Sequence, residues 1–274
     1  MKLRVATCMT LPEVDVDEAP LMAALAAAGI DAQLVAWDDP AADWDAHVPT
    51  IIRSTWNYAL HVDAFLAWCE RAHRAAPLIN PVDIIRANVR KRYLLQLGAR
   101  GVPVVPTQLV EPGTTTMLPA SRFVIKPEIG AGSLDTKVFD RPDEAARAHL
   151  ARVTARGAAL VQPYVPSVEE YGERSVIWID GELTHEIRKS PRFSGDDESV
   201  SGPFPITADE RAVAEAALAP YVDRILYGRV DLARDEAGQP MVMELELVEP
   251  SLFFSRHPPA LDRYIAGLKR RLSW

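Results

Sequence analysis

The chain has 274 residues, of which 48% are hydrophobic, enough to bury the core of one large domain or of two to three small ones. Its net charge of -8 and pI near 5.3 argue against a nucleic-acid-binding protein, because such proteins usually carry a basic stripe. No apolar run reaches the ~18 to 20 residues of a membrane span, so we expect a cytoplasmic protein that binds neither nucleic acid nor membrane.

The first 80 residues alternate between strand-like and helix-like segments. Strands are predicted at 3–7, 31–37, 50–53 and 78–80, and helices at 17–28 and 62–75. This order is typical of a small parallel α/β domain.

The pattern changes after residue 80. One helix is predicted over 83–97, followed by a proline-rich stretch with one short strand over 101–119. Further strands are predicted at 123–126, 136–139 and 159–165, with a helix near 142–156. Asp180-Gly181 predicts a hairpin within 175–189. A helix at 207–221 and two strands at 224–232 and 241–248 complete the predicted elements.

Two glutamates stand out in MELELVEPSLFF, which begins at Met243. Because successive side chains of a strand point to opposite faces, Glu244 and Glu246 would share one face, roughly 7 Å apart. Met243 and the two leucines would lie on the other face. An amphipathic strand with one wet face explains this pattern, and so does a cation held between the carboxylates.

The preceding strand adds an acid and an arginine. We predict the register in which Leu232 faces Met241. Arg229 then lies opposite Glu244, and Asp231 shares the face of the two glutamates. Three carboxylates suit Mg²⁺, which takes its remaining ligands from water and phosphate. A solvated surface hairpin with weak ion pairs is the alternative.

A bound nucleotide would also need cations and backbone donors for its phosphates. Lys126 ends the apolar run FVIK, and PEIGAGS follows, whose glycines let successive N–H groups close on an anion. A tight hairpin turn explains the glycines equally well. Lys91, placed on the helix after Asn88, has a solvated surface lysine as its alternative.

The order of these pieces resembles the ATP-grasp superfamily, and within it the glutathione-synthetase-like ligases. A helical lysine, a strand lysine, a glycine loop, an apolar strand and an acid at Glu173 precede Asp231 and Glu244-x-Glu246. The likeness extends from Asn80 to Phe254.

The resemblance implies a fold of mixed α/β (α+β) class with two domains. An N-terminal, Rossmann-like domain on the substrate side would span 1–80, and an ATP-grasp domain would span 81–274. Within the second domain, a lid subdomain is expected at about 115–165 and a catalytic subdomain at 166–274.

The resemblance also implies an ATP site. The residues concerned are Lys91 and Lys126 at the phosphates, Gly130, Gly132 and Ser133 in the mobile loop over them, and Gln162, Pro163, Tyr164 and Val165 in the segment whose backbone reads adenine. Gln162 replaces the acid that is usual in the family. Glu173 is the expected ribose ligand, with Glu169 and Glu170 as competitors.

Metal-binding and catalytic roles follow from the same resemblance. Asp231 and Glu244 match the family's magnesium ligands. Glu246 stands where many members have asparagine, and its extra charge suggests a second Mg²⁺; Mn²⁺ is an alternative metal. Arg229 resembles the arginine that stabilises the transferring phosphoryl group and the acyl oxyanion.

Basic residues for phosphate or a substrate carboxylate are expected at Arg188-Lys189. The resemblance does not distinguish these two residues. They open a polar loop that is expected to run to Pro205, and an exposed loop without such a role is the alternative.

Two stretches narrow the resemblance to the ATP-grasp enzymes that close O-ureidoserine into cycloserine. They are IRSTWNY, beyond a strand of the first domain where open α/β sheets bind ligands, and EPSLFF. The implied substrate contacts are Ser54, Thr55, Trp56, Asn57, Lys189, Glu249 and Ser251. A loop anchored by buried aromatic side chains also explains the first stretch.

The implied activity is that of an ATP-dependent ligase. ATP phosphorylates a carboxylate of a small, amino-acid-like substrate, and a nitrogen nucleophile then displaces phosphate from the acyl phosphate. With O-ureido-D-serine both groups belong to one molecule, and the product is the antibiotic D-cycloserine. The family likeness also suggests a homo-oligomer.

Two alternatives to this activity stay open. One is an intermolecular carboxylate-amine ligase, and the other is an ATP-binding protein without turnover. A chain without turnover would be free to lose Lys126, Arg229, Asp231 or Glu244, and all four are present.

Overall fold

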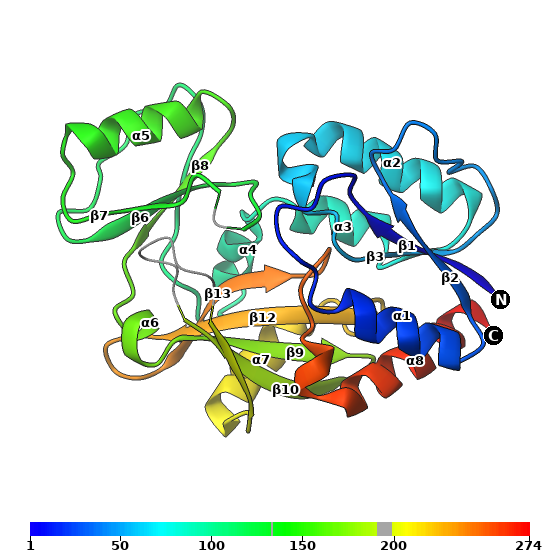
Figure 1. The fold of residues 1–274 in the computed structure, drawn as a ribbon. Coiled ribbons are helices and arrows are strands. Elements are labelled where there is room, and N and C mark those ends of the chain that lie inside the picture. The colour runs from blue at the N-terminus through cyan, green and yellow to red at the C-terminus, as the bar shows by residue number, and fades with distance from the viewer. Residues whose placement is uncertain (133, 191–198) are drawn as a thin grey trace.

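The computed structural model describes residues 1–132, 134–190 and 199–274. Its described residues form three β-sheets with helices packed against them, which confirms the predicted α/β (α+β) class. Figure 1 shows the parallel sheet on the right, the large antiparallel sheet below and the small antiparallel sheet at the upper left. No helix within these ranges combines the length and the apolar character that crossing a bilayer requires.

The N-terminal sheet is parallel, as predicted, with the strand order β2-β1-β3-β4. Its strands are β1 (Lys2–Thr7), β2 (Asp31–Ala36), β3 (Thr50–Ile52) and β4 (Leu78–Ile79). Its helices are α1 (Glu18–Ala27), the 3-10 helix η1 (Trp56–Leu60) and α2 (Val62–Ala75). Because the strands are parallel, their carboxyl ends meet at one edge of the sheet, where such sheets bind ligands.

Two short helices lead out of this sheet, so the single helix predicted over 83–97 is wrong. α3 (Val82–Asn88) ends before α4 (Tyr93–Ala99) begins. In the turn between them, the Lys91 amide donates to the Glu128 carbonyl at 2.9 Å, a partner outside either helix. The apolar periodicity hides the break because side chains on both sides of it are buried. Lys91 therefore projects from a turn and not from a helix.

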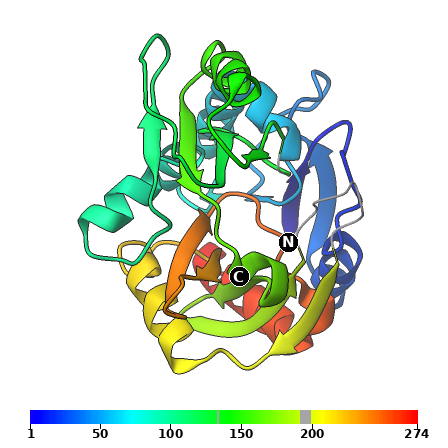
Figure 2. The ribbon, with the colours of Figure 1, turned by 90° about the vertical axis from the view of Figure 1, so that its left-hand side faces the viewer.

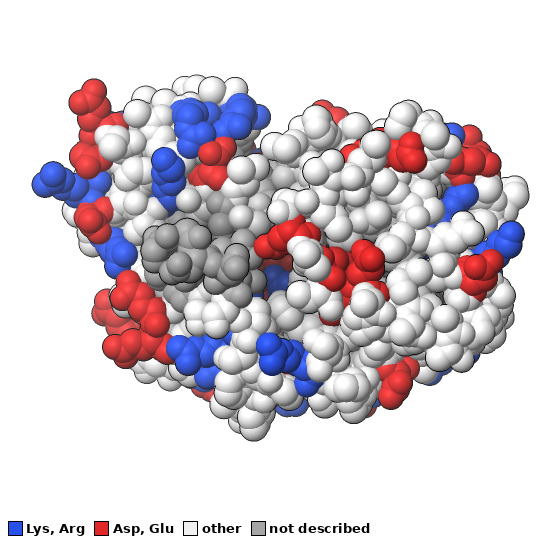
Figure 3. Space-filling view, in the orientation of Figure 1, with Lys and Arg blue, Asp and Glu red and all other residues white. Residues whose placement is uncertain are grey.

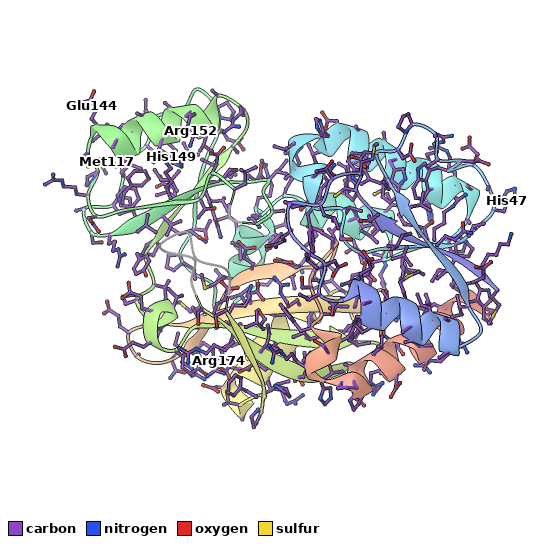
Figure 4. The ribbon with its side chains drawn as sticks, viewed as in Figure 1. His47, Met117, Glu144, His149, Arg152 and Arg174 are labelled. Atoms are coloured by element: carbon purple, nitrogen blue, oxygen red, sulfur yellow. The ribbon has the colours of Figure 1, made fainter. Side chains whose placement is uncertain are left out.

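The small antiparallel sheet has the order β5-β8-β6-β7. Its strands are β5 (Gln108–Val110), β6 (Phe123–Pro127), β7 (Lys137–Phe139) and β8 (Ala159–Pro163), and α5 (Glu144–Thr154) packs against it. Two side chains of α5 reach the segment before β7 (Figure 4). His149 Nε2 lies 3.0 Å from the Asp135 carbonyl, and Arg152 donates to the Asp135 carboxylate at 2.7 Å. They anchor the chain just after its glycine-containing stretch.

The large antiparallel sheet has the order β11-β10-β9-β12-β13. Its strands are β9 (Glu173–Ile179), β10 (Glu182–Lys189), β11 (Val200–Phe204), β12 (Tyr227–Arg234) and β13 (Pro240–Glu246). The predicted hairpin at Asp180-Gly181 is confirmed, with φ of 42° and 96° at the two turn residues. The strand β11 lies inside the stretch predicted as a loop up to Pro205, so that part of the prediction is wrong.

Helices cover both faces of this sheet (Figure 2). They are α6 (Ser167–Glu170) before β9, α7 (Ala208–Leu218) on one face, and the 3-10 helix η2 (Phe254–Arg256) with α8 (Pro258–Leu272) on the other. α8 is not among the predicted elements, although Leu261, Ile265 and Leu268 recur at helical spacing.

The parallel sheet and the large sheet share one hydrophobic core. Val5 and Ile51 of the first sheet pack in the same cluster as Ile177 of the second and Tyr264 of α8. The division of the chain at residue 80 therefore stays a proposal, because the parallel sheet ends at Ile79 while its core continues into the sheet that follows.

Candidate active site

The β12-β13 hairpin sets the geometry of the site, and its register differs from the predicted one. Arg229 pairs with Glu246, and Asp231 pairs with Glu244. At Arg229 the prediction is wrong by two residues. One comes from Leu232, which faces Val242 and not Met241, and the other comes from a bulge opposite the step from Asp231 to Leu232. A shift of two keeps every side chain of this stretch on its face, so Asp231, Glu244 and Glu246 still lie on one side.

The bulge does move Met243. This side chain packs with Val165 and Met241, whereas Leu245 belongs to the core beneath α7. The expectation that Met243 and Leu245 share a face is therefore wrong. The apolar surface to which Met243 belongs consists of Val105, Val165, Val168 and Ala233, with Tyr164, Met241 and Met243 packed against them. Of these, the sequence predicted only Tyr164 and Val165 as nucleotide-binding residues.

Glu244 binds the two predicted phosphate-binding lysines. Lys91 Nζ lies 2.9 Å from Glu244 Oε2, and Lys126 Nζ lies 2.9 Å from Oε1. The lysines come from the α3-α4 turn and from β6, more than a hundred residues before Glu244. Burial would raise the pKa of Glu244, but the two lysines outweigh it and hold that pKa below its usual range.

Arg229 joins the other two acids. It donates to Asp231 from Nε at 2.8 Å and from Nη2 at 2.9 Å, and its Nη2 lies 2.7 Å from Glu246 Oε1. Asp231 also accepts from the Ser175 hydroxyl at 2.6 Å and from Lys189 Nζ at 2.9 Å. Arg229 and Lys189 outweigh the effect of burial and hold the pKa of Asp231 well below its usual range.

Glu173, the expected ribose ligand, stands at the start of β9 next to this cluster. Lys189 pairs with it. Burial raises the pKa of Glu173 to about 7, and the charge of Asp231 adds to that rise while Lys189 opposes it. Its competitor Glu169 lies elsewhere, where it accepts from the Tyr164 hydroxyl at 2.7 Å.

The structure separates Arg188 from Lys189. Lys189 points into the acidic cluster, whereas Arg188 projects from the opposite face of β10, because successive strand side chains alternate. The Arg188 guanidinium donates to the Glu170 carbonyl at 2.5 Å and crowds Gly172. The expected contact of Arg188 with phosphate or a substrate carboxylate, which would make it catalytic, has no support in this geometry, whereas Lys189 lies at the site.

Asp231, Glu244 and Glu246 are the candidate ligands for Mg²⁺. The described residues contain no group of three or more His, Cys, Asp or Glu side chains already arranged around a metal position. Each acid instead pairs with a lysine or arginine of the same site. The three carboxylates still fit Mg²⁺, because this ion prefers carboxylate oxygens as ligands. They would be available to it once phosphates bind the lysine and arginine side chains that now pair with them.

The remaining ATP-site candidates lie on the small sheet. Gln162 on β8 donates to the Thr107 hydroxyl at 2.8 Å, so its amide serves the protein. Pro163 ends β8, the Tyr164 amide donates to the Arg122 carbonyl at 3.0 Å, and Val165 joins the apolar surface beside Met243. Gly130 and Gly132 lie between β6 and β7, whereas Ser133 is outside the described residues.

The substrate candidates at the end of β3 lie close to the loop after β13. Ser54 is buried, with its hydroxyl 3.0 Å from that of Thr7. The Thr55 hydroxyl is buried and has no hydrogen-bond partner among the described groups. Trp56 Nε1 donates to the Glu249 carbonyl at 3.2 Å, whereas the Asn57 amide is bonded to Trp37 and Asp38.

Glu249 and Ser251 belong to that loop. Burial raises the pKa of the Glu249 carboxyl to about 8, and the nearby charge of Glu246 adds to the rise. The Ser251 carbonyl accepts from Arg229 Nη1 at 3.1 Å. The structure thus brings most of the predicted charged residues to one region, namely Lys91, Lys126, Lys189, Arg229, Asp231, Glu244, Glu246 and Glu249. Figure 3 shows acidic and basic side chains interspersed over one face of the molecule, without a continuous basic stripe.

Two residues of this region escaped the sequence analysis. Asp17 and Arg53 are buried and form an ion pair of 3.1 Å beneath the loop. The available signal for Arg53 was a charged residue within the IRSTWNY stretch itself, directly after a buried strand. Asp17 gave none, because an acid at the start of a helix usually caps that helix.

The chain is similar in sequence to proteins of cycloserine biosynthesis. A model of the family described as D-cycloserine synthetase DcsG, N-terminal domain, matches residues 3–80. The cycloserine biosynthesis protein DcsG of Streptomyces lavendulae is 36% identical over 293 residues, which cover 98% of this chain and 97% of that protein.

Solved structures show the same relationship. The crystal structure of D-cycloserine synthetase DcsG matches with a TM-score of 0.89 and 35% identity, covering 99% of this chain and 100% of that one. D-alanine–D-alanine ligase from Bacillus anthracis, solved with ATP, matches with a TM-score of 0.70 and 15% identity over 100% of this chain and 96% of that one. The second likeness concerns the fold alone, and both confirm the fold expected from the sequence.

Proposed function

The chain belongs to the D-cycloserine synthetase family of ATP-grasp ligases, and from this we propose that it closes O-ureido-D-serine into D-cycloserine at the expense of ATP. The observation that carries the proposal is the charged cluster around β13. Glu244 holds Lys91 and Lys126, while Arg229 holds Asp231 and Glu246 on the same face.

This cluster has the composition that a metal-nucleotide complex requires. Its cations and anions pair with one another. Lys91 and Lys126 would bind the phosphates of ATP, and Glu244 would then be available as a metal ligand. Asp231, Glu244 and Glu246 would hold Mg²⁺, which supplies charge neutralisation at the phosphates when it is bound.

The neighbouring residues place the rest of the nucleotide. The apolar surface that contains Val165 and Met243 accepts the adenine ring, and Glu173, which pairs with Lys189, binds ribose. Gly130 and Gly132 supply backbone donors for the phosphates. The lysine beside Asp231, Lys189, takes the role that the sequence left open between it and Arg188.

The reaction begins at the carboxylate of the substrate. A carboxylate oxygen attacks the terminal phosphorus of ATP, ADP leaves, and an acyl phosphate forms. Arg229 stabilises the negative charge that develops on the phosphoryl group and then on the acyl oxygen. The carboxyl group and the attacking nitrogen belong to the same molecule. Holding that molecule in a folded conformation, with the two groups close together, supplies much of the remaining rate acceleration.

Ring closure follows within the same molecule. The oxygen-bound nitrogen of the ureido group attacks the acyl carbon, and phosphate leaves as the five-membered ring forms. Atom balance then requires water to remove the carbamoyl group as carbamic acid, because cycloserine carries a hydrogen at that nitrogen. Trp56, Glu249 and the end of β3 lie where the ureido end of the substrate is recognised.

Phosphate release tests the proposal. Purified protein is supplied with Mg²⁺, ATP and either O-ureido-D-serine alone or pairs of amino acids, and the products are identified by mass. We expect phosphate release with O-ureido-D-serine alone and a product of the mass of cycloserine. Release that requires two amino acids would reject ring closure and indicate an intermolecular ligase.

A further inference from the structure

Asp17 stands at the start of α1, yet its carboxylate does not cap that helix. It turns instead to the loop after β13. Asp17 Oδ2 accepts from the backbone N–H groups of Leu252 and Phe253, at 2.5 and 3.1 Å, and Oδ1 accepts from Phe254 at 2.8 Å. Three successive N–H groups that close on one carboxylate form an anion-binding concavity.

Arg53 completes this arrangement from the end of β3. Its Nη2 lies 3.1 Å from Asp17 Oδ2 and 2.9 Å from the Pro250 carbonyl. Arg53 is only 2% exposed, and Asp17 is fully buried. Asp17 and Arg53, which flank α1 and β3, thus hold the loop that follows the β12-β13 hairpin.

Side chains bond four successive carbonyls of the same loop. Trp56 binds that of Glu249, and Arg53 binds that of Pro250. Arg229 Nη1 binds the Ser251 carbonyl at 3.1 Å, and His185 Nε2 lies 3.0 Å from that of Leu252. The Ser251 contact is the important one, because the same guanidinium binds Asp231 and Glu246. Asp17 binds the amides of residues 252–254, which directly follow Ser251, the residue that Arg229 contacts.

We propose that Asp17 is a built-in carboxylate that fills the anion-binding site of residues 252–254 and thereby positions Arg229 for the reaction of a single substrate. This inference rests on the proposed function. A ligase that joins two amino acids also has to bind the free carboxylate of the acceptor near Arg229, and backbone N–H groups beside a guanidinium suit that task.

In this chain the Asp17 carboxylate occupies the N–H groups of residues 252–254. The carboxylate of a second amino acid cannot bind there, and a substrate that contains both the acyl donor and the nucleophile does not need that binding site. Asp17 acts through the loop, so it is a positioning and specificity-determining residue and touches no reacting atom.

Chemical rescue tests the proposal. Asp17→Gly removes the carboxylate and leaves room for formate. With O-ureido-D-serine, the variant should lose at least about tenfold in kcat while it keeps its affinity for ATP, because Arg229 is misplaced and the phosphate-binding lysines are untouched. Formate should restore several-fold activity, and formamide, its neutral analogue, should not. Glu18→Gln, which removes a charge from the next residue, is the matched control and should keep the wild-type kcat.

Two results would overturn the proposal: a wild-type kcat in Asp17→Gly, or equal rescue by formamide. If Asp17→Gly does not fold, Asp17→Asn replaces it; a folded variant with reduced kcat supports the proposal, and one with full kcat overturns it. If neither variant folds, hydrogen exchange of the 252–254 amides in the wild-type protein decides, with slow exchange in support and exchange typical of an open loop against.

The design separates this inference from the proposed function. Wild-type protein that is silent with O-ureido-D-serine refutes the function. The amide exchange of residues 252–254 still tests the anion-binding site in that case, because it needs no turnover.

Discussion

Asn88 hydrogen-bonds to the backbone of Leu245 as a neighbouring strand would. Its side-chain nitrogen donates to the Leu245 carbonyl at 2.8 Å, and its side-chain oxygen accepts from the Leu247 amide at 2.8 Å. β13 is the edge strand of its sheet and Leu247 follows it directly, so among the described residues no strand pairs with these backbone groups on that side. A helix outside the sheet therefore fixes the segment that carries Glu244 and Glu246.

Replacing Asn88 should destabilise the fold. Asn88→Leu keeps the approximate volume but leaves the Leu245 carbonyl and the Leu247 amide buried and unpaired, which we expect to lower the free energy of unfolding by about 2 kcal/mol. Urea denaturation measures the change. Gln239→Leu, at an exposed turn, is the control and should stay within about 0.5 kcal/mol of wild type. An Asn88→Leu midpoint equal to that of wild type would contradict the strand-like role.

Glu244→Gln tests the assignment of the metal and phosphate residues. The substitution keeps the size of the side chain and removes the charge that binds Lys91 and Lys126. We expect phosphate release to fall by at least about a hundredfold, because the amide is a poor ligand for a hard cation. Circular dichroism checks that the variant is folded. Unchanged phosphate release in the folded variant would contradict the assignment.

Lys189 and Arg188 form a matched pair, since they are adjacent and carry the same charge. Lys189→Met should lower kcat/KM by roughly a hundredfold, because it leaves Asp231 and Glu173 without their shared cation at the site. Arg188→Met should have a much smaller effect on kcat/KM, because its guanidinium lies on the opposite face of β10. Steady-state kinetics of both variants decide, and a larger loss in Arg188→Met would reverse the assignment.

We expect the protein to lose stability in mild acid because His185 is buried in its neutral form. Burial lowers the pKa of His185 from 6.5 to about 4, and the nearby His257 adds to this shift. The unfolded state therefore binds the proton more strongly, so stability is full above about pH 6.5 and falls as the pH decreases toward 4. The loss attributable to this residue is about 3 kcal/mol.

Urea denaturation at pH 7, 5.5 and 4 measures this dependence on pH. His185→Gln should flatten it, whereas His73→Gln, on the exposed side of α2, should leave it as in wild type. An unchanged dependence in His185→Gln would show that other groups govern the loss in acid.

The sequence predicted the elements whose physical signals are local. Alternation and helical periodicity located β1, α1 and α2 within one residue, and Asp180-Gly181 marked its hairpin because both residues tolerate positive φ. The acids of β13 were found by their spacing alone. The resemblance to a known family supplied their expected role in metal binding, whereas their pairing with Lys91, Lys126 and Arg229 is a property of the fold that the sequence did not predict.

Long-range and one-residue effects escaped prediction. Arg229 pairs with Glu246 and not with Glu244, in part because of a bulge of a single residue, which alternation does not reveal. The break before Lys91 is stabilised by the carbonyl of Glu128, distant in the chain. Asp17 binds amides more than two hundred residues away, and its local sequence is that of an ordinary helix start.

The most direct test of the account is the stoichiometry of ADP against ring product with O-ureido-D-serine as the only amino-acid substrate. Mass spectrometry quantifies cycloserine, and a coupled assay quantifies ADP in the same reaction. We expect one ADP for each cycloserine formed, with no second amino acid required. ADP formation that depends on an added amine, or ADP without any ring product, would contradict it.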